Sequence, residues 1–211
     1  PDFYDAGGLL HGFQIWVNLP AKHKMMSPRY QEIPELDSPA VENEGVWARV
    51  IAGECMGVAS TIDTVIPITL IHVKMGPNAV LRQKIDPDLN AMIYAFGGSV
   101  KVVNRPGVRS YPLPLAFGVK QQVNDGELAL LSDGDLIELK CDKAAEFLIL
   151  AGPEINEPIA RYGPFVMNTR EEIHQAIADH GHETELVKAD SSVYSQLPNC
   201  CKYNDGAECA H

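Results

Sequence analysis

Histidine is missing from a long middle part of the chain. None occurs between Val73 and Ile173, and all seven histidines of the chain lie outside that stretch. Zinc sites and many iron and copper sites are built from imidazole nitrogens. The sequence therefore predicts no metal centre formed by this part of the chain.

Positive charge and long apolar runs are also scarce. The chain has 17 Lys and Arg against 28 Asp and Glu, which gives a net charge of −11. Binding to nucleic acid needs a basic face, so we expect no direct nucleic-acid partner. No apolar run approaches the ~20 residues of a membrane helix, and no signal-peptide pattern is visible, so we expect an intracellular protein without a membrane partner.

Cysteine is present in a number that does not suggest a disulfide framework. The chain has five cysteines, and three of them, Cys200, Cys201 and Cys209, fall in the last twelve residues. This pattern favours a reduced, intracellular protein. The three cysteines and His211 fit no standard zinc module, so we interpret residues 183–211 as a polar tail, with a metal site there as the minor alternative.

Motifs of catalysis and phosphate binding are absent as well. The sequence contains no Gly-x-Ser-x-Gly, no P-loop and no Gly-x-Gly-x-x-Gly. No serine or cysteine is paired with a recognisable base. We therefore assign no catalytic, cofactor-binding or metal-binding residue to this chain.

What the sequence does contain, from Val46 onward, is a series of short apolar or alternating segments separated by turn residues. Many short strands at close spacing predict a β-sandwich or barrel, here over residues 46–155. The predicted strands are 46–52, 64–75, 91–96, 99–103, 127–131, 135–140 and 146–151.

The ends of the chain differ from this middle part. Residues 12–19 are rich in β-formers and predict a strand, whereas 20–45 contain four prolines and many charges and predict an irregular connection. After the strands, Asn168 or Thr169 can cap a helix whose apolar residues recur at i, i+3 and i+4 and which we expect to end near Gly181.

Two runs of the sequence resemble the pirin family. HGFQIWVNLPAKHKMMSPRYQ, residues 11–31, is similar to a run at the end of the first pirin barrel, and EPIARYGPFVMNTREEIHQAI, residues 157–177, is similar to the pirin C-terminal run. Pirins contain two β-barrels in tandem. The resemblance implies an all-β cupin (jelly-roll) barrel with a short C-terminal helix, plus remnant strands of a second barrel.

The resemblance also implies a division of the chain. It gives terminal strands of an N-terminal cupin and a loop over 1–45, a C-terminal cupin barrel over 46–155, a C-terminal extension with a helix over 156–182, and the tail over 183–211. Pirins hold a metal with three His and one Glu upstream of the first run. No residue of this chain matches those ligands, so iron or another divalent metal is expected only in a full-length pirin.

The second barrel can be tested against the general cupin metal motifs. Counting back from Gly98 puts the acidic ligand at Ala91 and the two histidines at Lys84 and Asp86, or at Ile85 and Pro87. Counting forward from Gly126 puts the third histidine at Ile137. None of these residues is the ligand that the motif requires.

The remaining conspicuous residues have structural interpretations. We expect His72 to be a core or strand-face histidine with a hydrogen-bond partner, and His11 to begin a strand. His174, His180 and His182 cluster around the expected helix end, where a weak zinc or nickel site is a minor alternative. The three large aromatic residues Trp16, Trp47 and Phe165 are predicted to be core anchors.

The resemblance leaves two functions open. The preferred one is a non-catalytic protein-interaction module of the transcription-cofactor type, in the nucleus or cytoplasm, with a transcription regulator or signalling protein as partner. The alternative is a fragment of a metal-dependent, quercetin 2,3-dioxygenase-like pirin whose active site lies in the missing N-terminal half. An unpaired strand within residues 1–20 also predicts self-association.

Overall fold

The computed structural model describes residues 7–8, 11–103, 108–110 and 121–189. It divides into two compact units. One unit contains residues 25–156, and the other combines residues 1–24 with 157–211. No described helix has the length and apolar character required to cross a membrane.

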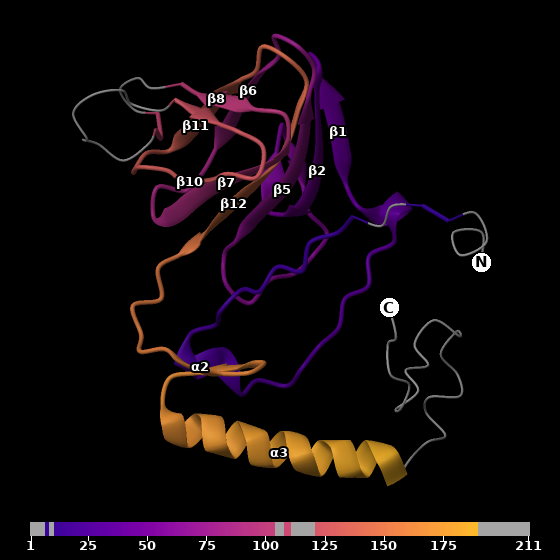
Figure 1. The fold of residues 1–211 in the computed structure, drawn as a ribbon, viewed down its shortest axis with the longest axis vertical. Coiled ribbons are helices and arrows are strands. Elements are labelled where there is room, and N and C mark those ends of the chain that lie inside the picture. Colours follow the sequence, from indigo (N-terminus) through magenta and orange to yellow (C-terminus); the bar gives the residue numbers. More distant parts are fainter. Residues whose placement is uncertain (1–6, 9–10, 104–107, 111–120, 190–211) are drawn as a thin grey trace, which may run out of the picture. The chain divides into compact units, whose positions relative to one another are not determined.

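The unit of residues 25–156 is formed by two antiparallel sheets (Figure 1). The larger sheet has six strands in the order β1-β2-β5-β12-β7-β10, and the smaller has four in the order β6-β11-β8-β9. The strands of the larger sheet are β1 Ala40–Asn43, β2 Val46–Ala52, β5 Thr69–Met75, β12 Ala145–Pro153, β7 Leu89–Gly97 and β10 Leu128–Leu130. Those of the smaller sheet are β6 Val80–Lys84, β11 Leu136–Lys140, β8 Val100–Val102 and β9 Gln122–Val123.

Three short elements complete the part of this unit that the structure describes. They are the 3-10 helix η1 Glu35–Asp37 and the two strands of a small hairpin, β3 Glu54–Cys55 and β4 Val58–Ala59. The all-β jelly roll predicted from the sequence is confirmed.

The two sheets bury a common apolar core, and strict alternation along the strands produces it. In β2, every second residue from Val46 to Ala52 is buried and the residues between them are partly exposed. Because side chains alternate across a strand, one face of each sheet is apolar and points inward. Phe147, Ile71, Ile93 and Leu139 are completely buried members of this core.

One tight turn explains why the sequence has a glycine at position 98. Gly98 has a φ of +78°, a conformation that L-residues rarely adopt, and a Cβ there would lie 2.5 Å from the carbonyl oxygen of Ala144. Both the backbone conformation and the close approach of the neighbouring chain therefore require glycine. This turn connects the end of β7 to the start of β8, beside the start of β12.

The described part of the second unit has two helices and a hairpin. Its elements are α2 Ala21–Lys24, β13 Ala160–Tyr162, β14 Phe165–Met167 and α3 Arg170–Ala189. Thr169 caps α3: its Oγ1 accepts a hydrogen bond from the Glu172 amide at 3.2 Å, and Glu172 Oε2 accepts from the Asn168 and Thr169 amides at 2.8 and 2.9 Å. This reciprocal capping box fixes where the helix begins.

Several expectations about these elements are wrong. Residues 12–19 do not form a strand, because no described segment pairs with them. The helix continues past Gly181 to Ala189. Within the connection expected to be irregular, β1 forms as a strand because it pairs with β2 from Ala40↔Arg49 to Asn43↔Val46.

Candidate functional site

The interior of the jelly roll is where a cupin would hold a metal, and here apolar side chains fill it. Ile85, Ala91 and Ile137, which occupy expected ligand positions, are 3%, 2% and 0% exposed and belong to the core cluster. Neither an isoleucine nor an alanine side chain has a donor atom for a metal ion. The residues present at these positions do not fit a cupin metal.

One polar side chain that points inward near these positions, that of Gln83, already has hydrogen-bond partners. Gln83 of β6 is 5% exposed, and its Nε2 donates hydrogen bonds to the carbonyl oxygens of Glu54 at 2.8 Å and Lys84 at 2.7 Å. Buried amides require such partners. Among the described residues, no group of three or more His, Cys, Asp or Glu side chains is arranged to hold a metal ion.

Arg109 is a buried cation that holds two loops at one end of the jelly roll. It is 1% exposed. Its Nε donates to the carbonyl oxygen of Gly134 at 2.7 Å, and its Nη2 donates to those of Asp86 at 2.9 Å and Pro87 at 3.2 Å. The main-chain amide of Arg109 also donates to the carbonyl oxygen of Leu136 at 2.7 Å.

The charge of Arg109 is stabilised by its surroundings despite burial. Burial lowers the pKa of the guanidinium, and the carboxylates of Asp133, Asp86 and Asp135 oppose that shift. Asp86 and Asp135 also line an open cavity of about 570 Å³ at this end of the unit. The arginine therefore connects the two loops through main-chain acceptors, with carboxylates nearby.

The outer face of the six-stranded sheet holds a cluster of aromatic and charged side chains. His72 Nε2 lies 2.7 Å from Glu146 Oε1, and Lys74 Nζ lies 3.4 Å from the same oxygen. Lys74 and Arg49 each approach the ring of Trp47 at 5.4 Å, a cation–π distance. His72 is thus a strand-face histidine with a hydrogen-bond partner, as expected.

The rest of this outer face is apolar towards its β10 edge. Cross-strand pairing puts Leu148 opposite both His72 and Tyr94, and Tyr94 opposite Leu128. Leu128 and Leu130 of β10 are 56% and 58% exposed. A sheet face turned to water normally has polar residues at these positions, so this face is unusually apolar.

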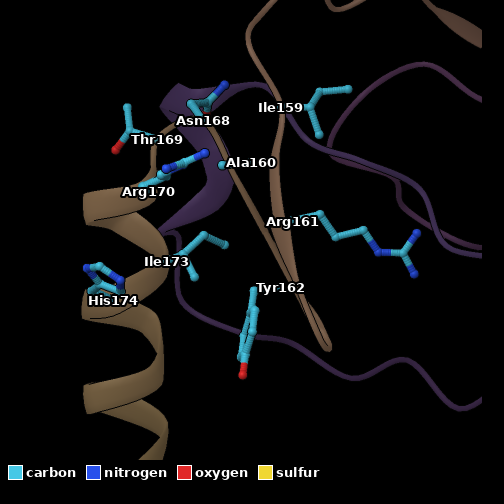
Figure 2. A pocket seen from close by; sticks show the side chains of 9 residues that line it. All are labelled: Ile159, Ala160, Arg161, Tyr162, Asn168, Thr169, Arg170, Ile173 and His174. Carbon is cyan, nitrogen blue, oxygen red and sulfur yellow. The ribbon is translucent and has the colours of Figure 1, made fainter.

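The second unit contains a pocket of about 540 Å³ between the hairpin and the start of α3 (Figure 2). Ile159, Tyr162 and Ile173 form an apolar part of its lining, and Arg170 and His174 project from the helix. The Arg161 side chain extends away from the helix in Figure 2, and its guanidinium lies 5.9 Å from the ring of Trp16. The guanidinium groups of Arg161 and Arg170 therefore do not converge on one point, as they would in a site for a single small anion.

Glu157 joins the two pirin-like runs within this unit. Its Oε2 accepts hydrogen bonds from the Ala21 amide at 2.7 Å and from Asn168 Nδ2 at 3.0 Å. A second connection comes from Lys24, whose Nζ donates to Asn18 Oδ1 at 2.5 Å and to the Val166 carbonyl oxygen at 3.2 Å. Segments more than a hundred residues apart in sequence therefore form one small unit.

Three residues predicted to be core anchors lie elsewhere. Trp16 is 56% exposed, Trp47 lies on the outer sheet face rather than in the core, and Phe165 is only partly buried, against His180 with ring centroids 5.7 Å apart. Aromatic residues were expected inside because of their apolar area, but strand register turns Trp47 outward.

The remaining predicted residues have various outcomes. His11 does not begin a strand; its ring contacts that of Phe13 at 5.2 Å. His174 and His180 lie within α3 rather than at its end, because the helix extends to Ala189. Cys200, Cys201, Cys209 and His211 lie outside the described residues.

Sequence reasoning missed Arg109 and Glu157. Arg109 follows a Gly-Val pair and precedes a proline-rich segment, so nothing in its neighbourhood marks it as buried. Glu157 begins the second pirin-like run, which is the one signal that distinguishes it from other surface carboxylates. Their roles depend on segments that are distant in sequence.

Two antiparallel sheets around a common apolar core define a cupin-type domain. The profile of the pirin C-terminal cupin domain matches residues 70–184. The chain belongs to the pirin family. Its two pirin-like runs are the segments that Glu157 and Lys24 connect.

The similarity extends to curated proteins and solved structures. Human Pirin is 34% identical over 171 residues, and a putative quercetin 2,3-dioxygenase of Vibrio cholerae is 36% identical over 183 residues. These matches cover 80% and 83% of this chain but 55% and 59% of the relatives. The crystal structure of a quercetin 2,3-dioxygenase from Acinetobacter baumannii has a TM-score of 0.67 at 30% identity, covering 80% of this chain and 55% of that one. The chain thus spans about half the length of the relatives that it matches.

Proposed function

We propose that the jelly roll of this chain is a non-catalytic protein-interaction module of the pirin family. The observation that supports the proposal is the apolar filling of its interior. Ile85, Ala91 and Ile137 are at most 3% exposed at the positions where a cupin metal site would need donor atoms. A domain with such a core offers its outer surfaces to other molecules.

The kind of partner follows from the family alone. By analogy with other pirins, we propose a transcription regulator or a signalling protein as partner, in the nucleus or the cytoplasm. The net charge of −11 favours a partner protein over nucleic acid, because phosphate groups would be repelled.

A second candidate function is supported by the relatives' names. The Vibrio protein is named a putative quercetin 2,3-dioxygenase and the Acinetobacter structure a quercetin 2,3-dioxygenase, and this chain matches 59% and 55% of them. A protein containing this chain would then oxidise quercetin in a part that lies outside the matched region. The jelly roll described here would be its second, metal-free domain.

One experiment on the purified chain tests whether this chain is itself catalytic, which neither candidate function expects. The chain is incubated with iron, copper or nickel, its metal content is measured by mass spectrometry, and quercetin consumption is followed with and without a chelator. We expect no stoichiometric metal and no chelator-sensitive turnover. Stoichiometric metal with turnover that chelation abolishes would overturn the interaction-module proposal for this chain.

A matched variant sharpens the measurement. Ile137→Ala removes apolar volume at an expected ligand position without adding a donor atom, whereas Ile137→His adds an imidazole at the same place. If the wild type binds metal weakly through surface histidines, both variants retain that binding. Metal binding that increases only in Ile137→His would indicate that the interior lacks ligands and is otherwise accessible.

A further inference from the structure

We propose that the outer face of the four-stranded sheet binds an acidic, extended segment of a partner protein, with carboxylates at alternate positions. The inference rests on the proposed function and deepens it, because it assigns the surface that the interaction module uses and the chemistry of its partner. This face is formed by the outward side chains of three adjacent strands, β6, β11 and β8 (Figure 1). They include four basic residues, Arg82, Lys84, Lys101 and Lys140, and we call this surface the basic face.

Strand register brings the basic side chains together. Lys140 of β11 is the cross-strand partner of Lys101 of β8, and Arg82 of β6 is the cross-strand partner of Glu138. Arg82 and Lys140 are therefore diagonal neighbours, at a separation of about 7–8 Å. Like charges directly opposite each other destabilise a sheet, so a bound anion would relieve the repulsion between Lys101 and Lys140. In a chain with 28 acidic and 17 basic residues, this cluster is the opposite of the overall charge.

A buried carboxylate orients Arg82 for binding. Glu138 is only 2% exposed; its Oε2 accepts a hydrogen bond from Arg82 Nε at 2.9 Å, and its Oε1 lies 3.5 Å from Lys140 Nζ. The Arg82 side chain is still 61% exposed, and its two terminal nitrogens have no hydrogen-bond partner among the residues that the structure describes. A guanidinium held through Nε presents these two nitrogens as a fork, which is the geometry that binds a carboxylate with two hydrogen bonds.

The spacing of the cations fits an extended peptide. In an extended chain, side chains on one side recur about every 7 Å. This distance matches both the diagonal from Arg82 to Lys140 and the step from Arg82 to Lys84 on the same strand. Carboxylates at alternate positions of a bound segment can therefore reach successive cations. Lys84 attracts them least, because it lines a cavity together with Asp86 and Asp135.

The charge of the rest of the chain favours a short acidic segment over other polyanions. Attraction between exposed charges extends over roughly 8–10 Å at physiological salt, so a short segment interacts mainly with the basic face. A nucleic acid continues beyond this face, where the net charge of −11 repels its phosphates. A second copy of the chain carries the same net charge and is repelled in the same way.

The test is fluorescence anisotropy with the purified chain and two labelled peptides. One peptide alternates Glu and Ser, and the other has Gln in place of every Glu. We expect the Glu peptide to bind at low ionic strength, with an affinity that decreases as salt is added, and the Gln peptide not to bind. No binding of the Glu peptide, or equal binding of the two peptides, would overturn the proposal.

Matched substitutions locate the binding surface. Arg82→Gln should weaken binding of the Glu peptide at least about tenfold, and Arg82→Lys should recover only part of the loss because it lacks the forked geometry. Lys74→Gln makes an equivalent charge change at a 55% exposed lysine of the six-stranded sheet and should bind like the wild type. Lys101→Gln leaves both contacts of Glu138 intact, so it should weaken binding even if Arg82→Gln proves unstable.

The other possible occupants give distinct results. A single-stranded oligonucleotide that binds the basic face more tightly than the Glu peptide would overturn the proposal. So would a dimer, observed by sedimentation, that Lys101→Gln disrupts, and so would unchanged peptide binding by both Arg82→Gln and Lys101→Gln. None of these outcomes affects the metal-content and quercetin measurements, so a failure of this proposal is distinguishable from a failure of the proposed function.

Discussion

The two units of this chain are stabilised in different ways. In residues 25–156, completely buried side chains from both sheets, such as Phe147 and Ile137, meet in one apolar core. In the other unit, the described connections between distant segments are mostly polar, through Glu157 and Lys24. The first kind of stabilisation is proportional to buried area and is spread over many residues, whereas the second depends on a few atoms.

The largest expected effect on stability comes from a substitution in the core. Phe147→Ala should destabilise the jelly roll by about 3–5 kcal/mol, because it removes a completely buried aromatic ring and leaves a cavity. Denaturant unfolding followed by circular dichroism measures the change. Leu130→Ala, at a 58% exposed position of the same unit, is the control and should change stability by about 0.5 kcal/mol or less. Equal effects of the two substitutions would contradict the core described here.

The next effect tests Arg109, the buried cation that holds two loops of the jelly roll together. Arg109→Met should destabilise the unit by about 3 kcal/mol, because the carbonyl oxygens of Gly134, Asp86 and Pro87 lose their donor. Arg109→Lys keeps the charge but not the forked geometry, and should recover only part of the loss. If the methionine and lysine variants are both as stable as the wild type, the clamp is unimportant.

A smaller effect should be confined to the second unit. Glu157→Ala removes the acceptor of the Ala21 amide and of Asn168 Nδ2, and should cost about 2 kcal/mol locally, since both hydrogen bonds end on a carboxylate. Hydrogen exchange should increase at residues 18–24 and 165–172. The unfolding of residues 25–156 should stay unchanged, and a parallel loss of stability there would show that the units are coupled.

The smallest effect at neutral pH concerns a buried thiol. Burial, with a further contribution from the charge of Glu54, raises the pKa of Cys55 from 9.0 to about 11. A raised pKa means that the folded state favours the neutral thiol, so its contribution is complete below pH 9.0 and disappears as the pH rises through about 11. Cys55→Ala should flatten the stability profile between these values. An unchanged alkaline slope in that variant would assign the loss to other groups.

The sequence and the structure agree best where periodicity is strong. The strand β2 was predicted with its observed bounds, because VWARVIA alternates without interruption. The strand β6 was missed because VLRQK contains three polar residues, and its pairing with β11 from Val80↔Lys140 to Lys84↔Leu136 defines it instead. Conversely, residues 12–19 have a strand composition without a described partner.

The candidate sites show the same division. The sequence alone indicated that Ile85, Ala91 and Ile137 are not the ligands that the cupin motifs require at those positions, since side-chain identity is sufficient for that conclusion. It gave no indication that Arg109 is buried, because its acceptors are the carbonyl oxygens of Asp86, Pro87 and Gly134, which any residue type provides. A main-chain acceptor leaves no trace in the residue type.

By itself, the sequence determined the all-β fold and the pirin family, because local alternation, turn residues and two family runs are properties of contiguous segments. Only the tertiary structure decided which residues from distant segments meet, as in the bonds of Glu157 to Ala21 and Asn168. It also decided that Trp47 lies on the outer face of its sheet. Strand register and long-range contacts depend on how distant segments of the chain come together in the fold, and no single segment contains that information.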